Sequence, residues 1–226
     1  MKKNKIIFIV IAIILILTIA IITIMQLYYR KGIKNSNLEL YNGLPVNISR
    51  ASYLFDTSTP EKAVGISDYV FVAKINKIAR TEYRDPVTIE TGLFSSEVWT
   101  TPYTYYEIEV VKNIKGELIT SEPIEYMQYG GLEEDGKSYT FIQGTSLLEI
   151  GKYYILMADT YGENGGDISG TEPNRIVLLD GVTSNEEVES SELVKRYEEA
   201  YENEFIPEGF YNWERYTSKY DVNYDG

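Results

Sequence analysis

Tyrosine is the residue type through which this chain is best equipped to bind another molecule, because 21 of its 226 residues are tyrosines. A tyrosine ring offers rigid, amphipathic area that stacks on a sugar ring or on a peptide. Four tyrosines fall on two predicted strands, and a glycine pair that permits close backbone approach follows one of them. The predicted ligand-binding residues are Tyr103, Tyr105, Tyr126, Tyr129, Gly130 and Gly131.

A purely structural role for the same residues remains an alternative. Side chains alternate between the two faces of a strand, so some of these tyrosines would face the core and others would be ordinary strand formers. The pair Gly130-Gly131 would then mark a bulge or turn at the end of a strand.

Catalysis is restricted by what the chain lacks, since it contains no cysteine and no histidine. A Ser-His-Asp triad, a Cys-His pair and a histidine-ligated zinc site are thereby excluded. What remains is a carboxylate pair, Glu107 and Glu109, which would lie on one face of a strand and could cleave a glycosidic bond. A solvated strand face explains that pair more simply, so no catalytic residue is predicted.

Two acidic segments carry the hard oxygen ligands that Ca²⁺ prefers. The terminal segment 221–226 (DVNYDG) matches the start of a calcium-binding loop but stops at its sixth position. Ca²⁺ needs six to eight oxygens, which neither segment clearly offers, so we predict no metal site and no cofactor. Any calcium affinity at the terminus should be no better than about millimolar. The second of these two acidic segments, besides 221–226, is a glycine-rich loop with Asp159, Glu163, Asn164, Asp167 and Glu172.

The charge distribution indicates which partners to expect. The chain has a formal net charge of −13, and every acidic residue lies after position 34. The C-terminal part therefore repels nucleic acid and anionic lipid headgroups. We predict no nucleic-acid partner, and a protein or glycan partner at the cell surface.

The run Ile6 to Met25 contains no charged residue and no proline, and its length suffices to cross a bilayer. No small-x-small cleavage pattern follows it, which favours an uncleaved anchor over a cleaved signal peptide. Basic residues on the two sides nearly balance, but a large C-terminal part is usually exported. We predict a cytoplasmic tail at 1–5, a single-pass anchor at 6–27 and a C-terminal domain outside. The composition and the lack of disulfides suggest a low-GC Gram-positive bacterium.

The sequence that follows the apolar run predicts a mainly β fold. A tether at 28–58 leads to a β domain at 59–182, which opens with a short helix after Thr59. A loop is expected at 80–102. A helix at 183–206 should pack on the domain through Leu193, Tyr197 and Ala200, followed by a tail at 207–226. Predicted strands are 69–78, 103–111, 123–129, 139–142, 153–158 and 175–179.

Residues 61–160 follow an ordered set of short motifs, which read SDYVFVAKI (67–75), VVKNIKGEL (110–118), IEYMQYGG (124–131) and LEIGKYYILM (148–157). This order resembles a family of exported bacterial domains that are similar to OB-like barrels of the netrin and metalloproteinase-inhibitor type. The resemblance implies a small OB-like β-barrel. The inhibitors chelate a protease metal through an N-terminal cysteine, and this chain has none, so that activity is not implied.

The sequence therefore predicts a membrane-anchored extracellular domain that acts as a non-catalytic binding or interaction module. The alternative is a carboxylate-based hydrolase that acts on the cell envelope.

Overall fold

The computed structural model describes residues 16, 18–21, 23, 40–92, 95–161, 166–170, 172–210 and 216–225. The chain divides into two compact units, Met1–Leu40 and Tyr41–Gly226. In the first unit, the described residues between 16 and 23 are helical. Among the described positions, no helix is both long and apolar enough to cross a membrane. The predicted tail at 1–5 and most of the predicted anchor at 6–27 lie outside the described residues.

The second unit is mainly β, as predicted. Its larger sheet has the strand order β10-β8-β3-β4-β5-β9. Strand β9 pairs in parallel with β5 and antiparallel with β8, so β3, β4, β5, β9 and β8 form a closed ring. The strands of this sheet are β3 (Tyr69–Gly92), β4 (Ser95–Lys115), β5 (Ile124–Tyr129), β8 (Tyr153–Tyr161), β9 (Asp167–Ser169) and β10 (Ile176–Leu178).

A smaller sheet with the order β1-β2-β7-β6 uses residues that were predicted to form a tether. Strand β2 pairs in parallel with β7, from Val46 opposite Tyr139 to Ser49 opposite Ile142. The predicted tether at 28–58 therefore includes two strands that belong to the fold. The strands of this sheet are β1 (Leu40–Tyr41), β2 (Leu44–Ser49), β6 (Gly131–Leu132) and β7 (Tyr139–Ile142).

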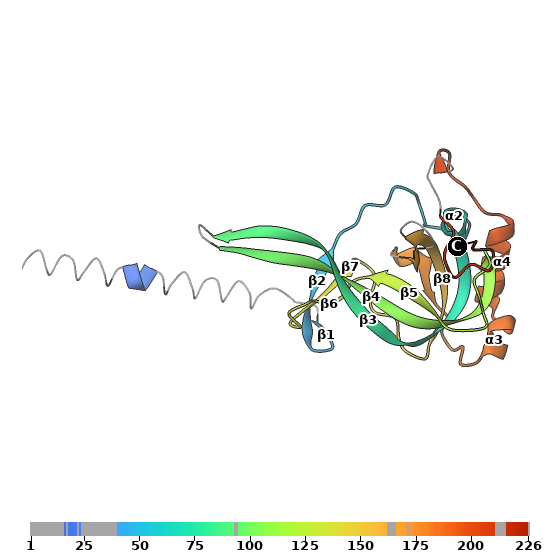
Figure 1. Ribbon diagram of the computed structural model, residues 1–226, viewed down its shortest axis with the longest axis horizontal. Coiled ribbons are helices and arrows are strands. Elements are labelled where there is room, and N and C mark those ends of the chain that lie inside the picture. Colours follow the sequence, from blue (N-terminus) through green and yellow to red (C-terminus); the bar gives the residue numbers. More distant parts are fainter. Residues whose placement is uncertain are drawn as a thin grey trace, which may run out of the picture. The chain divides into compact units, whose positions relative to one another are not determined.

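Strands β3 and β4 continue through the region 80–102, which was predicted to be a loop (Figure 1). They form a two-stranded arm that extends beyond the other strands and pairs Val87 with Trp99 and Thr88 with Val98. The loop was predicted from the polar and small residues of this region, and that prediction was wrong. Asp85-Pro86 does not end the strand. It forms a bulge instead: Asp85 adopts a φ of 53°, and the register shifts between Arg84 and Val87.

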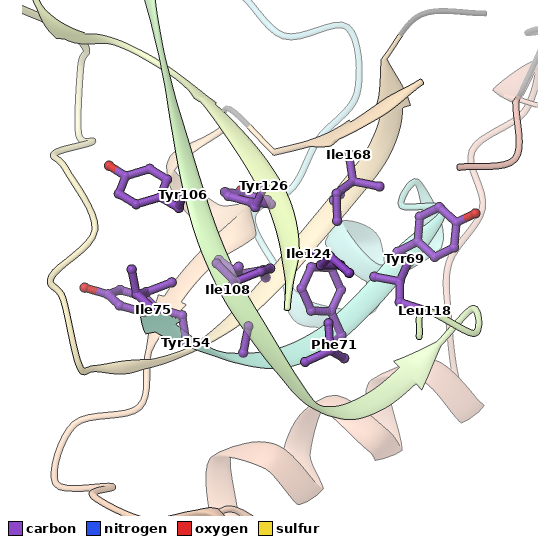
Figure 2. Packing of buried hydrophobic residues seen from close by; sticks show 14 of the residues in the cluster. Tyr69, Phe71, Ile75, Tyr106, Ile108, Leu118, Ile124, Tyr126, Tyr154 and Ile168 are labelled. Carbon is purple, nitrogen blue, oxygen red and sulfur yellow. The ribbon is translucent and has the colours of Figure 1, made fainter. Parts of the chain in front are cut away.

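The interior of the ring holds a cluster of buried side chains from all five of its strands (Figure 2). On β3, Phe71, Ala73 and Ile75 face this cluster, while Val70 and Val72 face a second cluster that includes residues of three helices. The start of β3 is thus buried on both faces, as its continuous apolar run predicted. Because both of its faces are buried, the start of β3 has a fixed position. The residues that directly precede it enter the candidate site described below.

The helices of the second unit are α2 (Pro60–Gly65), the 3₁₀ turn η1 (Pro173–Arg175), α3 (Asn185–Ser190) and α4 (Glu192–Glu202). The single helix predicted at 183–206 is divided into α3 and α4 by Ser191, which has an extended backbone. Its side-chain hydroxyl accepts the N–H of Val194 and so caps the start of α4. Within α4, the buried residues are Val194, Tyr197 and Ala200. Leu193 was predicted to be buried but is 38% exposed.

The predicted tail at 207–226 contacts the β domain at the described positions. Phe210 and Ser218 are buried, and Asp221 forms an isolated bridge with Leu118. The hydroxyl of Tyr69 donates a hydrogen bond to Asp221 at 2.9 Å. The two segments that were expected to be connectors, 28–58 and 207–226, therefore both contribute to the folded surface.

Candidate ligand-binding site

Two of the predicted ligand-binding tyrosines are buried. Tyr126 lies in the interior cluster, where its hydroxyl donates to the carbonyl oxygen of Gly170 at 2.9 Å. Tyr105 is covered by the guanidinium of Arg80, which lies 3.8 Å from the ring centroid. Burial raises the pKa of both hydroxyls. Neither ring offers open surface to a ligand, so for these two residues the structural alternative holds.

The hydroxyl of Tyr105 lies among charged side chains. We call Tyr105, together with Glu82, Arg84, Asp167 and Lys219, the Tyr105 network. Its hydroxyl donates to the Asp167 carboxylate at 2.8 Å and accepts a hydrogen bond from Arg84. Arg84 also donates to Glu82 at 2.5 Å, and Lys219 reaches Asp167 at 3.1 Å. Hydrogen bonds from Tyr105 and Lys219 outweigh the desolvation of Asp167, and the pKa of that carboxyl is lowered.

The other two predicted tyrosines, Tyr103 and Tyr129, are half-buried and lie together. Their rings pack edge to face with centroids 5.6 Å apart. They line a pocket of about 290 Å³, the Tyr103 pocket, whose wall also includes Asp159, Thr160 and Arg175. These two tyrosines therefore come close to Thr160 and Arg175, which the sequence did not single out for binding.

The glycine pair connects β5 to β6 between the two sheets. Gly130 has a φ of 104° and donates its N–H to the carbonyl of Pro102 at 2.8 Å. A Cβ at Gly130 would lie 2.7 Å from the carbonyl oxygen of Thr140, and one at Gly131 would meet the hydroxyl of Thr104. Both positions need glycine for chain packing, which favours the structural interpretation of the pair.

A second pocket of about 390 Å³ shares Asp159, Thr160 and Arg175 with the Tyr103 pocket. We call it the Arg175 pocket. Its apolar and aromatic lining residues are Tyr53, Leu54, Phe55, Ile66 and Phe210, and its polar lining residues are Ser52, Asp68, Asp159, Thr160, Glu172 and Arg175.

Arg175 is the most deeply buried charged residue of this site, with 4% of its surface exposed. Its Nη1 donates to Asp159 at 2.7 Å, and its Nη2 donates to the hydroxyl of Ser67 at 2.9 Å. Asp159 also accepts the backbone N–H of Asp68 at 3.2 Å. The guanidinium is thus held in one orientation at the end of η1, where the chain enters β10.

The Arg175 pocket contains buried polar atoms that have no hydrogen-bond partner among the described residues. Within the described part of the chain, Thr160 Oγ1, Glu172 Oε2 and Arg175 Nε are buried and have no hydrogen-bond partner. All three residues line this pocket. Buried polar atoms are nearly always paired, because a missing partner costs about 1–3 kcal/mol. Their concentration in one pocket makes the Arg175 pocket the candidate ligand-binding site.

The electrostatics of Glu172 agree with this picture. Burial raises the pKa of its carboxyl, and the nearby Arg175 together with a hydrogen bond from Thr57 compensates only in part. A cation or a hydrogen-bond donor placed at this carboxylate would supply the missing compensation.

The apolar wall comes from segments far apart in the sequence. Phe55 and Phe210 pack edge to face with centroids 5.3 Å apart. Tyr53 and Leu54 are exposed at the mouth, and Leu54 keeps 71% of its surface in solvent. An apolar wall over a polar floor is the usual composition of small-molecule sites.

The carboxylates considered for catalysis have separate partners. Glu107 forms an ion pair with Lys77 at 2.7 Å, and Glu109 accepts a hydrogen bond from Asn185 at 3.1 Å. These contacts fit the solvent-facing strand interpretation better than a cleft with two facing acids.

The acidic segments are also divided among different contacts. Asp159 binds Arg175 and Asp167 binds Tyr105, while Glu163 and Asn164 lie outside the described residues. Asp221 accepts from Tyr69 and from the N–H of Asn223. Among the residues that the structure describes, no three acidic side chains gather as a metal site would require.

Sequence reasoning missed the centre and the walls of the Arg175 pocket. Arg175 stands directly before the apolar run 176–179, and a lone arginine in that position is a signal for a buried charge with a function. Tyr53 and Phe55 were assigned to a tether and Phe210 to a tail. Aromatic residues are rare in flexible segments, so their presence there was the available signal.

Comparison with known proteins does not assign the chain to a family. No protein-family model and no curated protein matches the chain. A function must therefore be argued from the site itself.

Proposed function

We propose that this protein is a non-catalytic binding module, and that its ligand site is the Arg175 pocket. The observation that carries the proposal is the group of three buried, unpaired polar atoms on residues that line one pocket. A module of this kind needs a preformed cavity and polar groups with unused hydrogen-bonding capacity, and the described residues provide both. The expected ligand is a protein segment or a glycan of the cell surface.

The proposed location is the outer face of the cell membrane, with residues 6–27 as a single-pass anchor and 1–5 in the cytoplasm. The support is the uncharged run Ile6 to Met25. Protease added to intact cells should remove the C-terminal domain from the anchor. Full protection of the domain, or its release into the medium in processed form, would contradict this location.

We also propose that the β domain is an OB-like barrel. Support comes from the closed five-strand ring, since an OB-fold is a five-stranded barrel. The order of the motifs at 67–75, 110–118, 124–131 and 148–157 along that ring is consistent with the resemblance to exported OB-like domains. This likeness concerns the fold and does not specify a ligand.

The binding proposal is tested with the full chain in detergent micelles and a mixture of muropeptides released from envelope. Native mass spectrometry should show saturable retention by the wild type. The Leu54→Trp variant should lose retention, because a larger side chain at the mouth obstructs the pocket. Leu193→Trp, an equivalent change on the exposed side of α4, is the matched control and should retain ligand.

Two results would count against the binding proposal. The first is that the wild type retains no muropeptide. The second is that the Leu54→Trp variant retains as much muropeptide as the wild type. The same spectra also test the envelope hydrolase, which remains the alternative function. Shortened muropeptides that disappear with Glu107→Gln or Glu109→Gln would favour the hydrolase.

A further inference from the structure

We propose that the Arg175 pocket recognises a primary ammonium group that adjoins a carbonyl and is attached to an apolar body. The free N-terminus of a peptide with an apolar first residue has this chemistry. The inference rests on the proposed function, because it assigns the ligand class to the same pocket.

Charge excludes an anionic ligand and favours a cation. Three carboxylates, Asp68, Asp159 and Glu172, line the pocket against the single guanidinium of Arg175. Asp159 already pairs with Arg175, and Asp68 accepts the backbone N–H of Thr160 at 3.3 Å. The unpaired oxygen of Glu172 therefore remains as the acceptor for an ammonium group.

The ligand must also offer a hydrogen-bond acceptor. Arg175 Nε–H can only donate, and the hydroxyl of Thr160 can donate as well. A carboxylate would satisfy these donors but would add negative charge beside Glu172. A neutral carbonyl next to the ammonium group satisfies them without that repulsion.

The unpaired oxygens are within reach of a ligand after small side-chain movements. Thr160 and Glu172 are only half-buried, and the terminal torsion of a glutamate has a broad energy profile. Arg175 is held by its two other hydrogen bonds. The guanidinium therefore acts as a fixed reference, around which Glu172 and Thr160 adjust to the ligand.

The apolar body is accommodated by the aromatic wall. Phe55 and Phe210 form an edge-to-face pair, and Tyr53 stands at the mouth. Aromatic faces attract a neighbouring cation as well as apolar groups. The adjoining Tyr103 pocket shares Asp159, Thr160 and Arg175, which gives the next residue of a peptide a place to continue.

The test compares four probes that keep the same phenyl group and differ in charge. They are phenylalaninamide, phenylalanine, N-acetylphenylalaninamide and 3-phenylpropionate, each titrated calorimetrically into the full chain in micelles. Phenylalaninamide should bind best. Acetylation of its amine should weaken binding about tenfold or more, since a hydrogen bond to a charged group is lost.

Glu172→Gln should reduce the preference for phenylalaninamide over its acetylated form to about threefold or less, because glutamine keeps the shape without the charge. The control Leu193→Trp should keep the full preference. Equal or tighter binding of the acetylated or anionic probe would overturn the ligand class and leave the binding proposal standing.

Two further outcomes separate the inference from the proposal beneath it. If no phenyl probe binds while muropeptide retention depends on Leu54, the ammonium inference fails alone. If neither the probes nor the muropeptides bind, both the inference and the proposed function fail.

Discussion

Two clusters of this domain use the same residue types and differ in whether their hydrogen bonds are complete. In the Tyr105 network, the described contacts give Arg84, Asp167 and Lys219 partners from the chain itself. In the Arg175 pocket, each of Thr160, Glu172 and Arg175 keeps one buried atom unpaired among the described residues. A complete network stabilises the fold, whereas an incomplete one costs stability until a ligand enters.

The difference shows why residue type alone does not identify a site. Arginine, carboxylate and tyrosine occur in both clusters, and Tyr105, the tyrosine of the network, was predicted to bind ligand. The Tyr105 ring is covered by Arg80 and its hydroxyl is paired. The predictions below test this contrast through stability, in order of decreasing effect.

The largest effect is expected when the complete network is broken. Asp167→Ala removes the acceptor of Tyr105 and the partner of Lys219, and should lower the free energy of unfolding by about 2 kcal/mol. Urea unfolding monitored by circular dichroism measures it. Asp135→Ala, which removes an exposed pair with Lys137, is the control and should change little. Equal losses in the two variants would refute the special status of the network.

A smaller effect of opposite sign is expected in the pocket. Glu172→Gln removes a buried charge that lacks full compensation, and should raise the free energy of unfolding at neutral pH by about 1 kcal/mol. The same urea titration measures it. Glu122→Gln, on the exposed surface, should show no comparable gain. A clear loss of stability in Glu172→Gln would indicate that its carboxylate is already satisfied by the chain.

The pH dependence sharpens the contrast. The lowered pKa of Asp167 means that its contribution is present above the ordinary value of 3.8 and is lost as the pH falls through the folded-state pKa. The raised pKa of Glu172 means that its cost appears as the pH rises above 4.5. Asp167→Asn should therefore be less stable than wild type at neutral pH and Glu172→Gln more stable. Both differences should shrink toward zero in acid unfolding series, and differences of the same sign would contradict the contrast.

The smallest effect is expected at Tyr103. Its hydroxyl donates to Asp85 at 3.1 Å at an exposed position, so Tyr103→Phe should change the free energy of unfolding by about 0.5 kcal/mol or less. Thermal unfolding of the two proteins side by side measures it. A loss as large as that of Asp167→Ala would show that Tyr103 belongs to the stabilising network.

Strand segments that are buried on both faces were predictable from the sequence, because burial requires apolar residues at successive positions. Continuous apolar residues marked the start of β3, and Tyr139–Ile142 was predicted with the bounds that β7 has. The arm escaped prediction because its polar and small residues are typical of a loop, and most of its described side chains are exposed, so burial imposes no pattern on them. The Arg175 pocket escaped because its parts, such as Tyr53, Arg175 and Phe210, meet only through tertiary contacts.

The parallel pairing of β2 with β7 has a consequence for biosynthesis. Val46 finds its partner Tyr139 only after the intervening chain has left the ribosome. At about 5–20 residues per second, that interval lasts roughly 5–20 seconds. Throughout it the edge of β2 that faces β7 stays unpaired, while the hairpin of β3 and β4 can close as soon as its own residues emerge. Holding factors that bind extended apolar segments should therefore find β2 during synthesis and release it once β7 has arrived.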